Sequence, residues 1–148
     1  MKETLKVKGI VDFKITDANG NLIKEWTEHN LITNAGRTFF AKKILDDFSV
    51  SGLVVDFIAL GSSDTPAQPT NTFLNAEEER VLISFKSVEN GIATFVSSVS
   101  GPEQYEVREA GLFNNDDPNT LLAHLILDNP FTKVSNEFLT IVWKVQIG

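Results

Sequence analysis

Residues 138–147, Phe138-Leu139-Thr140-Ile141-Val142-Trp143-Lys144-Val145-Gln146-Ile147, decide the fold class. Every second residue from Leu139 to Ile147 is apolar, and most residues between them are polar. A period of two is typical of a strand with one face buried and the other toward solvent. We therefore predict a terminal strand that carries Trp143 on its buried face as a structural residue.

The same pattern recurs upstream of this strand. Further strands are predicted at residues 5–15, 22–27, 53–60, 81–85, 92–96, 105–110 and 121–127. Asn19-Gly20 and Asn90-Gly91 supply the turn chemistry of two hairpins, because both residue types tolerate a positive φ. A turn or short helical piece is expected around residues 72–78. Asn129-Pro130 is expected to end the strand before it.

One segment has a helical period instead. Its apolar residues are Ala35, Phe39, Phe40, Ile44, Leu45 and Phe48. This spacing predicts a helix from about Ala35 to Asp46, with Asn34 as its N-cap. We expect the apolar stripe of this helix to pack against the sheet.

The chain has 148 residues, the size of one domain, so we predict a single β-sandwich domain over residues 1–148. Roughly eight strands, one helix and no alternation of strands with helices predict a mainly β fold. The expected form is an antiparallel β-sandwich, Ig-like or jelly-roll-like, with one helix packed on it, or a partly open barrel.

Composition argues against several functions. The net charge is −7, which disfavours a nucleic-acid partner, and the absence of cysteine excludes thiolate chemistry and disulfides. Residues 1–6 lack the apolar run of a secretion signal, and no stretch approaches the ~20 apolar residues of a membrane span. We therefore expect no membrane partner.

No motif in the chain points to catalysis or to a metal. His29 and His124 lack the spacing of metal ligands, and Gly61-Ser62 lacks the glycine-rich fingerprint of a phosphate loop. The cluster at residues 114–119 contains oxygens suited to calcium, but we expect it to be a solvated turn. The acidic run at residues 77–79 is expected to be solvated. We expect no enzyme activity, catalytic residue, cofactor or metal.

Glu109 is the polar residue that the pattern places inside the fold. On the predicted strand it shares a face with Tyr105 and Val107, and an inward carboxylate persists only when it is paired or accepts hydrogen bonds. We expect its partners to be backbone amides of a neighbouring turn or one of two arginines, Arg37 and Arg80. Its role is then to stabilise the fold.

The order of these elements resembles that of small tailed-bacteriophage virion structural proteins, including the N-terminal domains of tail-fibre proteins and stand-alone tail or collar proteins. The segments that carry the resemblance are residues 30–36, 57–66, 72–77 with Arg80, 108–114, 121–124 and 139–145. They span nearly the whole chain. The given sequence ends directly after its last predicted strand, so we expect no fibre shaft.

This resemblance implies a virion protein assembled in the host cytoplasm. Its partners would be other virion proteins and copies of itself. The leading expectation is a repeated subunit of the tail, collar or fibre-attachment apparatus, and a capsid decoration protein is the alternative. A host-surface carbohydrate-binding module is a third possibility, because Trp26 and Tyr105 could stack on sugars if they are exposed.

Overall fold

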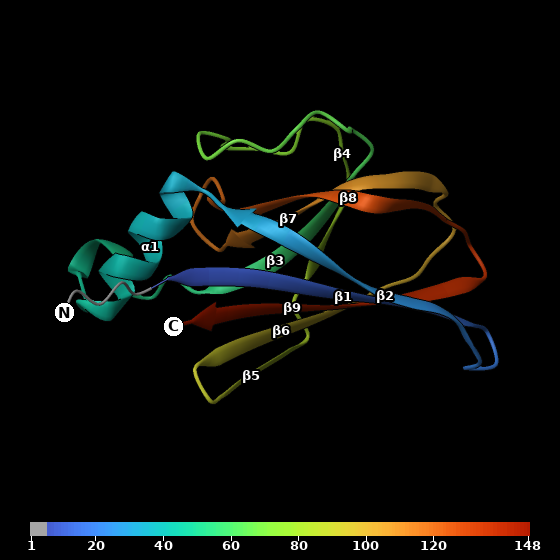
Figure 1. Ribbon diagram of the computed structural model, residues 1–148, viewed down its shortest axis with the longest axis horizontal. Coiled ribbons are helices and arrows are strands. Elements are labelled where there is room, and N and C mark those ends of the chain that lie inside the picture. The colour runs from blue at the N-terminus through green and yellow to red at the C-terminus, as the bar shows by residue number, and fades with distance from the viewer. Residues whose placement is uncertain (1–5) are drawn as a thin grey trace.

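The computed structural model describes residues 6–148, so the predicted strand start at Leu5 lies outside the described residues. Within these residues the chain forms nine strands and one α-helix, whose arrangement is drawn in Figure 1. The strands are β1 (Val7–Asp17), β2 (Leu22–Ile32), β3 (Val55–Gly61), β4 (Glu77–Leu82), β5 (Phe85–Glu89), β6 (Ile92–Val99), β7 (Tyr105–Asn114), β8 (Leu121–Lys133) and β9 (Glu137–Ile147). The helix α1 spans Asn34–Ile44, and a single 3-10 turn, η1, spans Phe48–Val50.

All strand pairs are antiparallel and form one sheet in the order β4-β3-β7-β8-β2-β1-β9-β6-β5. Strand β2 joins its two halves, because it pairs with β1 as far as Asn30 and with β8 from Leu31 onward. The sheet curls into a half-barrel (Figure 1). The mainly β class with one helix is therefore confirmed, whereas an Ig-like or jelly-roll-like sandwich is not.

The main core fills the concave side of this curled sheet. In β9, buried and partly exposed residues alternate from Leu139 to Gln146, as the sequence predicts. Trp143 and its neighbour Val11 on β1 are fully buried. Ile147 is the exception on this face, because it lies at the strand end and remains 44% exposed.

The turn expected around residues 72–78 is found at Asn75-Ala76, directly before β4 begins at Glu77, and it is not helical. Two predictions about strands are wrong. The strand predicted at 81–85 is divided at residues 83–84, where the chain passes from β4 to β5. Strand β8 continues through Asn129-Pro130, because its pairing with β7 skips these residues at a bulge and resumes at Phe131.

The helix starts close to its predicted position, but Thr33 is the N-cap instead of Asn34. The Thr33 hydroxyl accepts the N–H of Gly36 at 2.9 Å and donates to the Leu121 carbonyl at 2.7 Å. Gly36 lies so close to β8 that an added Cβ would be 2.0 Å from the Leu122 carbonyl oxygen. The cap and this glycine together fix the helix on the sheet.

Only the first half of α1 packs as predicted. Gly36 and Phe39 are buried, while Ile44, Leu45 and Phe48 are 68%, 77% and 91% exposed. The apolar stripe therefore does not lie against the sheet along its whole length, because the helix is fixed by its N-terminal turn. No helix within residues 6–148 is both long and apolar enough to cross a membrane.

Candidate functional site

Residues 62–76, here called the covering segment, lie over the outer face of the β3-β7-β8 half of the sheet (Figure 1). A second, smaller apolar cluster joins the segment to the sheet: Leu74 of the segment packs with Ala59, Phe113 and Leu121 of the strands. At Gly111 the packing is so close that an added Cβ would come within 2.9 Å of Leu74, Leu121 and Phe113. This half of the sheet is therefore buried on both faces.

Glu109 lies at the edge of this covered face. Contrary to the prediction, it does not share a face with Val107. A register shift between Val107 and Glu109 marks a bulge in the pairing of β7 with β8. Val107 and Ala110 both join the main core, three residues apart, so the bulge has moved Glu109 to the outer face. Its side chain is nevertheless fully buried, because the covering segment lies over it.

The Glu109 carboxylate accepts hydrogen bonds from three backbone amides of the covering segment. These come from Ala76 at 2.8 Å, Asn75 at 3.0 Å and Ser63 at 3.3 Å. Burial raises the pKa of this carboxyl, but hydrogen bonds from His124 and these amides outweigh burial and hold the net pKa below its ordinary value. The expectation of backbone amides as partners is met, but the predicted face is wrong, because the carboxylate is buried on the outer face of the sheet and not on the face of Val107.

His124 is the partner of Glu109 that sequence reasoning missed. Its Nε2 lies 3.0 Å from Glu109 Oε1, and its Nδ1 lies 2.9 Å from Asn71 Oδ1. Asn71 Oδ1 also accepts the N–H of Gln68, so both ring nitrogens face oxygen acceptors. A doubly protonated imidazole can donate to both of them. We call Glu109, His124 and Asn71 the clasp, because they join β7 and β8 to the covering segment.

Neither arginine proposed as a partner contacts Glu109. Arg80 pairs with Glu77 at 2.6 Å, donates to Asn119 Oδ1 and lies 3.8 Å from the centre of the Phe113 ring. Arg37 is exposed on α1. The bulge presents Glu109 to the covering segment, away from both arginines.

Trp143, the remaining residue predicted to be structural, lies at the centre of the main core and is fully buried. Its cross-strand neighbours are Val11 and Phe95, which belong to the same core. Within residues 6–148 its indole N–H has no hydrogen-bond partner. Trp143 therefore stabilises the fold through the volume that its side chain fills and through its apolar contacts.

A second buried carboxylate, Glu28 on β2, was not anticipated either. It accepts the backbone amides of Asp128 and Asn129 at 2.9 and 3.0 Å and the indole N–H of Trp26 at 2.9 Å. These two amides belong to the bulged part of β8, just before Pro130. Glu28 thus satisfies the backbone donors that the interrupted pairing leaves open.

The acidic run at residues 77–79 is not simply solvated. Each glutamate of this edge strand has its own partner: Arg80 for Glu77, the Ser62 hydroxyl for Glu78, and the Tyr105 hydroxyl for Glu79 at 2.6 Å. Burial and the contact with Glu79 raise the pKa of Tyr105. This edge therefore helps to hold the neighbouring strands in place.

The predicted turn at residues 114–119 is largely exposed, with the exception of Asn114. The Asn114 side chain is buried, and its Oδ1 accepts the amides of Asp116 and Thr120. It thereby sets the conformation of the turn. Within residues 6–148, no group of three or more His, Asp or Glu side chains converges as metal ligands, and His29 is exposed.

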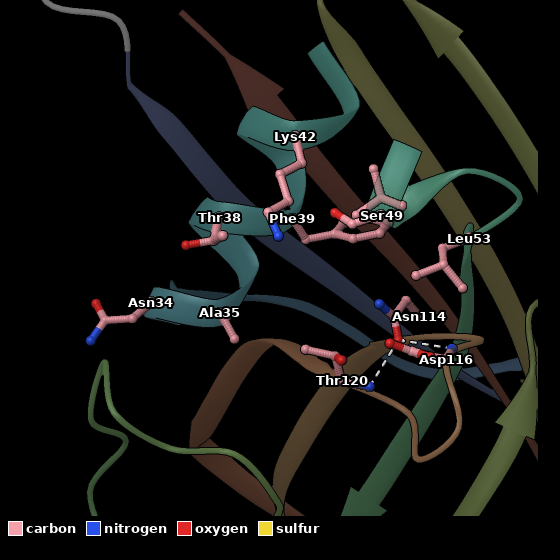
Figure 2. A pocket seen from close by; sticks show the side chains of 11 residues that line it. Asn34, Ala35, Thr38, Phe39, Lys42, Ser49, Leu53, Asn114, Asp116 and Thr120 are labelled. Carbon is pink, nitrogen blue, oxygen red and sulfur yellow. Dashed lines mark hydrogen bonds between the residues drawn. The ribbon is translucent and has the colours of Figure 1, made fainter. Parts of the chain in front are cut away.

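A hollow of about 370 Å³ opens between α1, η1 and this turn (Figure 2). Its apolar lining comes from Ala35, Phe39, Val50 and Leu53. Among its lining residues, Lys42 and Asp116 are the charged ones. The hollow is suited to an apolar side chain with a polar group beside it, and its lining residues Lys42 and Ser49 are close in the chain to the exposed residues Leu45 and Phe48.

The two aromatic residues considered for stacking on sugars are not free. Trp26 is half-buried, stacks on Phe13 at 5.3 Å and contacts the Phe131 ring edge-on. Tyr105 is also half-buried and is held by Glu79. Neither ring is available for stacking on a sugar as expected, so these residues do not support a carbohydrate-binding module.

Comparison of the chain with models of known protein families, with curated proteins and with solved structures finds no match.

Proposed function

We propose that this chain is a bacteriophage virion structural protein, a repeated subunit of the tail, collar or fibre-attachment apparatus that acts through protein–protein contacts. The resemblance in the order of its segments suggests this class. The observation that carries the proposal is a group of exposed apolar side chains, Ile44, Leu45 and Phe48, here called the helix-end patch.

The helix-end patch has the properties of a contact surface. Its three side chains lie within five residues at the end of α1 and the start of η1, and Phe48, which precedes the hollow-lining Ser49, is 91% exposed. Grouped exposed apolar residues in a folded chain mark sites of protein contact, whereas single ones do not. A partner that covers this patch would bury Phe48 and Leu45, and the nearby hollow offers an apolar lining to a further side chain of that partner.

The test is incorporation into assembled particles of the source phage. We expect Phe48→Ser and Leu45→Ser to lower the amount of the chain in purified particles at least several-fold while the melting temperature stays unchanged. Leu22→Ser is the matched control, because Leu22 is 52% exposed at the distant turn between β1 and β2. Quantitative mass spectrometry of the particles gives the amount of each variant.

Electron microscopy of the same particles distinguishes the possible locations. Density for several copies in the tail or collar supports the proposal, and density on the capsid surface indicates a decoration protein instead. Absence of the chain from purified particles contradicts a virion role of either kind.

A further inference from the structure

The curled sheet has two free edges, β4 and β5, which differ in their protection. Within residues 6–148, β4 pairs only with β3 and β5 pairs only with β6. The backbone groups on the outer side of an edge strand are a template for another strand. Charged side chains normally discourage such pairing, and β4 carries four in succession, Glu77 to Arg80.

Strand β5 lacks comparable protection. All five of its residues are exposed, and its register with β6 is regular from Phe85 to Glu89. Phe85 is 59% exposed and Val88 is 77% exposed. Lys86, which could guard the edge, is held by Asp56 at 3.1 Å. The edge therefore presents an open backbone flanked by apolar side chains.

We infer that β5 is a self-association edge, which pairs with β5 of a second copy of this chain in antiparallel fashion about a two-fold axis at Ser87. The axis is perpendicular to the sheet, so the two half-barrels share one continuous sheet across the interface. This inference goes beyond the virion role and does not depend on it.

The sequence of β5 is self-complementary in this register. Ser87 lies opposite its own copy, Phe85 opposite Glu89, and Lys86 opposite Val88. All five residues pair, and the methylene groups of Lys86 cover the exposed Val88 of the other copy. Shifting the register by one position on each strand places Lys86 opposite Lys86, which like-charge repulsion disfavours. The opposite shift places Val88 opposite Val88 but pairs only residues 87–89 of the strand. The register centred on Ser87 is therefore the one that pairs the whole of β5 with a second copy.

The experiment uses the absence of cysteine from the chain. Residues directly opposite on paired strands have Cβ atoms ~4.5–5.5 Å apart, close to the separation that a disulfide needs. We expect Ser87→Cys to give a disulfide-linked dimer rapidly under mild oxidation in dilute solution. Ser98→Cys, an exposed position on the same face of the neighbouring strand β6, is the matched control and should cross-link much more slowly.

Sedimentation equilibrium of the unmodified chain provides the second measurement. We expect a reversible monomer–dimer equilibrium whose dissociation constant rises about tenfold or more in Val88→Lys. Leu45→Lys, which places the same charge on the helix-end patch, should leave the constant unchanged. Equal cross-linking of the two cysteine variants, a wild-type chain that is monomeric up to about 1 mM, or a dimer indifferent to Val88→Lys would each overturn the inference.

Discussion

The two halves of the curled sheet differ in what covers their outer faces. In β7, six successive residues from Glu109 to Asn114 are buried, because the core lies on one side and the covering segment on the other. In β9, buried residues alternate with partly exposed ones, because only the core side is covered. The covering segment thus closes the outer face of the β3-β7-β8 half, while the outer face of the half that contains β9 and the β5 edge stay open.

This difference is visible in side-chain size and polarity. The covered strands use Ala110, Gly111 and Ala123, which allow close approach on both sides. The open strands place residues such as Thr140 and Lys144 on the outer face. Strands buried on both faces are expected to be nearly continuously apolar, whereas half-buried strands alternate. Glu109 is the exception, since it lies in a fully buried run.

The largest effect is expected in the core that the two halves of the sheet share. Trp143→Ala should lower the free energy of unfolding by about 3–5 kcal/mol, because the fully buried ring leaves a cavity. Lys144→Ala, one residue along the same strand on the open face, should change it by less than about 0.5 kcal/mol. Urea denaturation measures both. Similar losses in the two variants would mean that the open face is covered in solution.

The next effect concerns the clasp. Glu109→Ala should lower the free energy of unfolding by roughly 1–3 kcal/mol, because His124 and three backbone amides lose their acceptor. Glu106→Ala, on the same strand but exposed, is the control and should have little effect. An unchanged melting temperature in Glu109→Ala would show that the covering segment is held by its apolar contacts alone.

A smaller effect is expected from pH. The folded-state pKa of Glu109 lies below its ordinary value of 4.5, so the carboxylate adds stability above that value and loses it as the pH falls through the folded-state pKa. The difference in unfolding free energy between the wild type and Glu109→Gln should therefore shrink as the pH is lowered from neutral to below 4.5. Denaturation at several pH values measures this difference, and a constant difference would contradict it.

The sequence predicts the half-covered strands well because their pattern is local. The alternation in residues 138–147 reflects one buried face, and the strand appears where it is expected. The helix is also found near its predicted bounds. Its N-cap is displaced by one residue because the Thr33 hydroxyl has a distant partner, the Leu121 carbonyl, which local spacing does not reveal.

The candidate site is predicted less completely because it depends on contacts between distant segments. Strand alternation predicts that Glu109 is buried, but it does not predict the bulge that places Glu109 on the outer face of the sheet. The partnership with His124 joins β7 to β8 and depends on register. The loop after Gly61 lacks the fingerprint of a phosphate site, but the amide of Ser63 in that loop does bind an anionic group, the carboxylate of Glu109.

The measurement that tests this account most directly is hydrogen exchange of individual amides by NMR. The amides of Asn75 and Ala76 lie in a segment without regular secondary structure. We expect them to exchange slowly in the wild type, because the Glu109 carboxylate accepts a hydrogen bond from each. In Glu109→Gln this protection should fall, while protection in β6 and β9 stays unchanged. Rapid exchange of Asn75 and Ala76 in the wild type would contradict the claim that the clasp closes this face of the sheet.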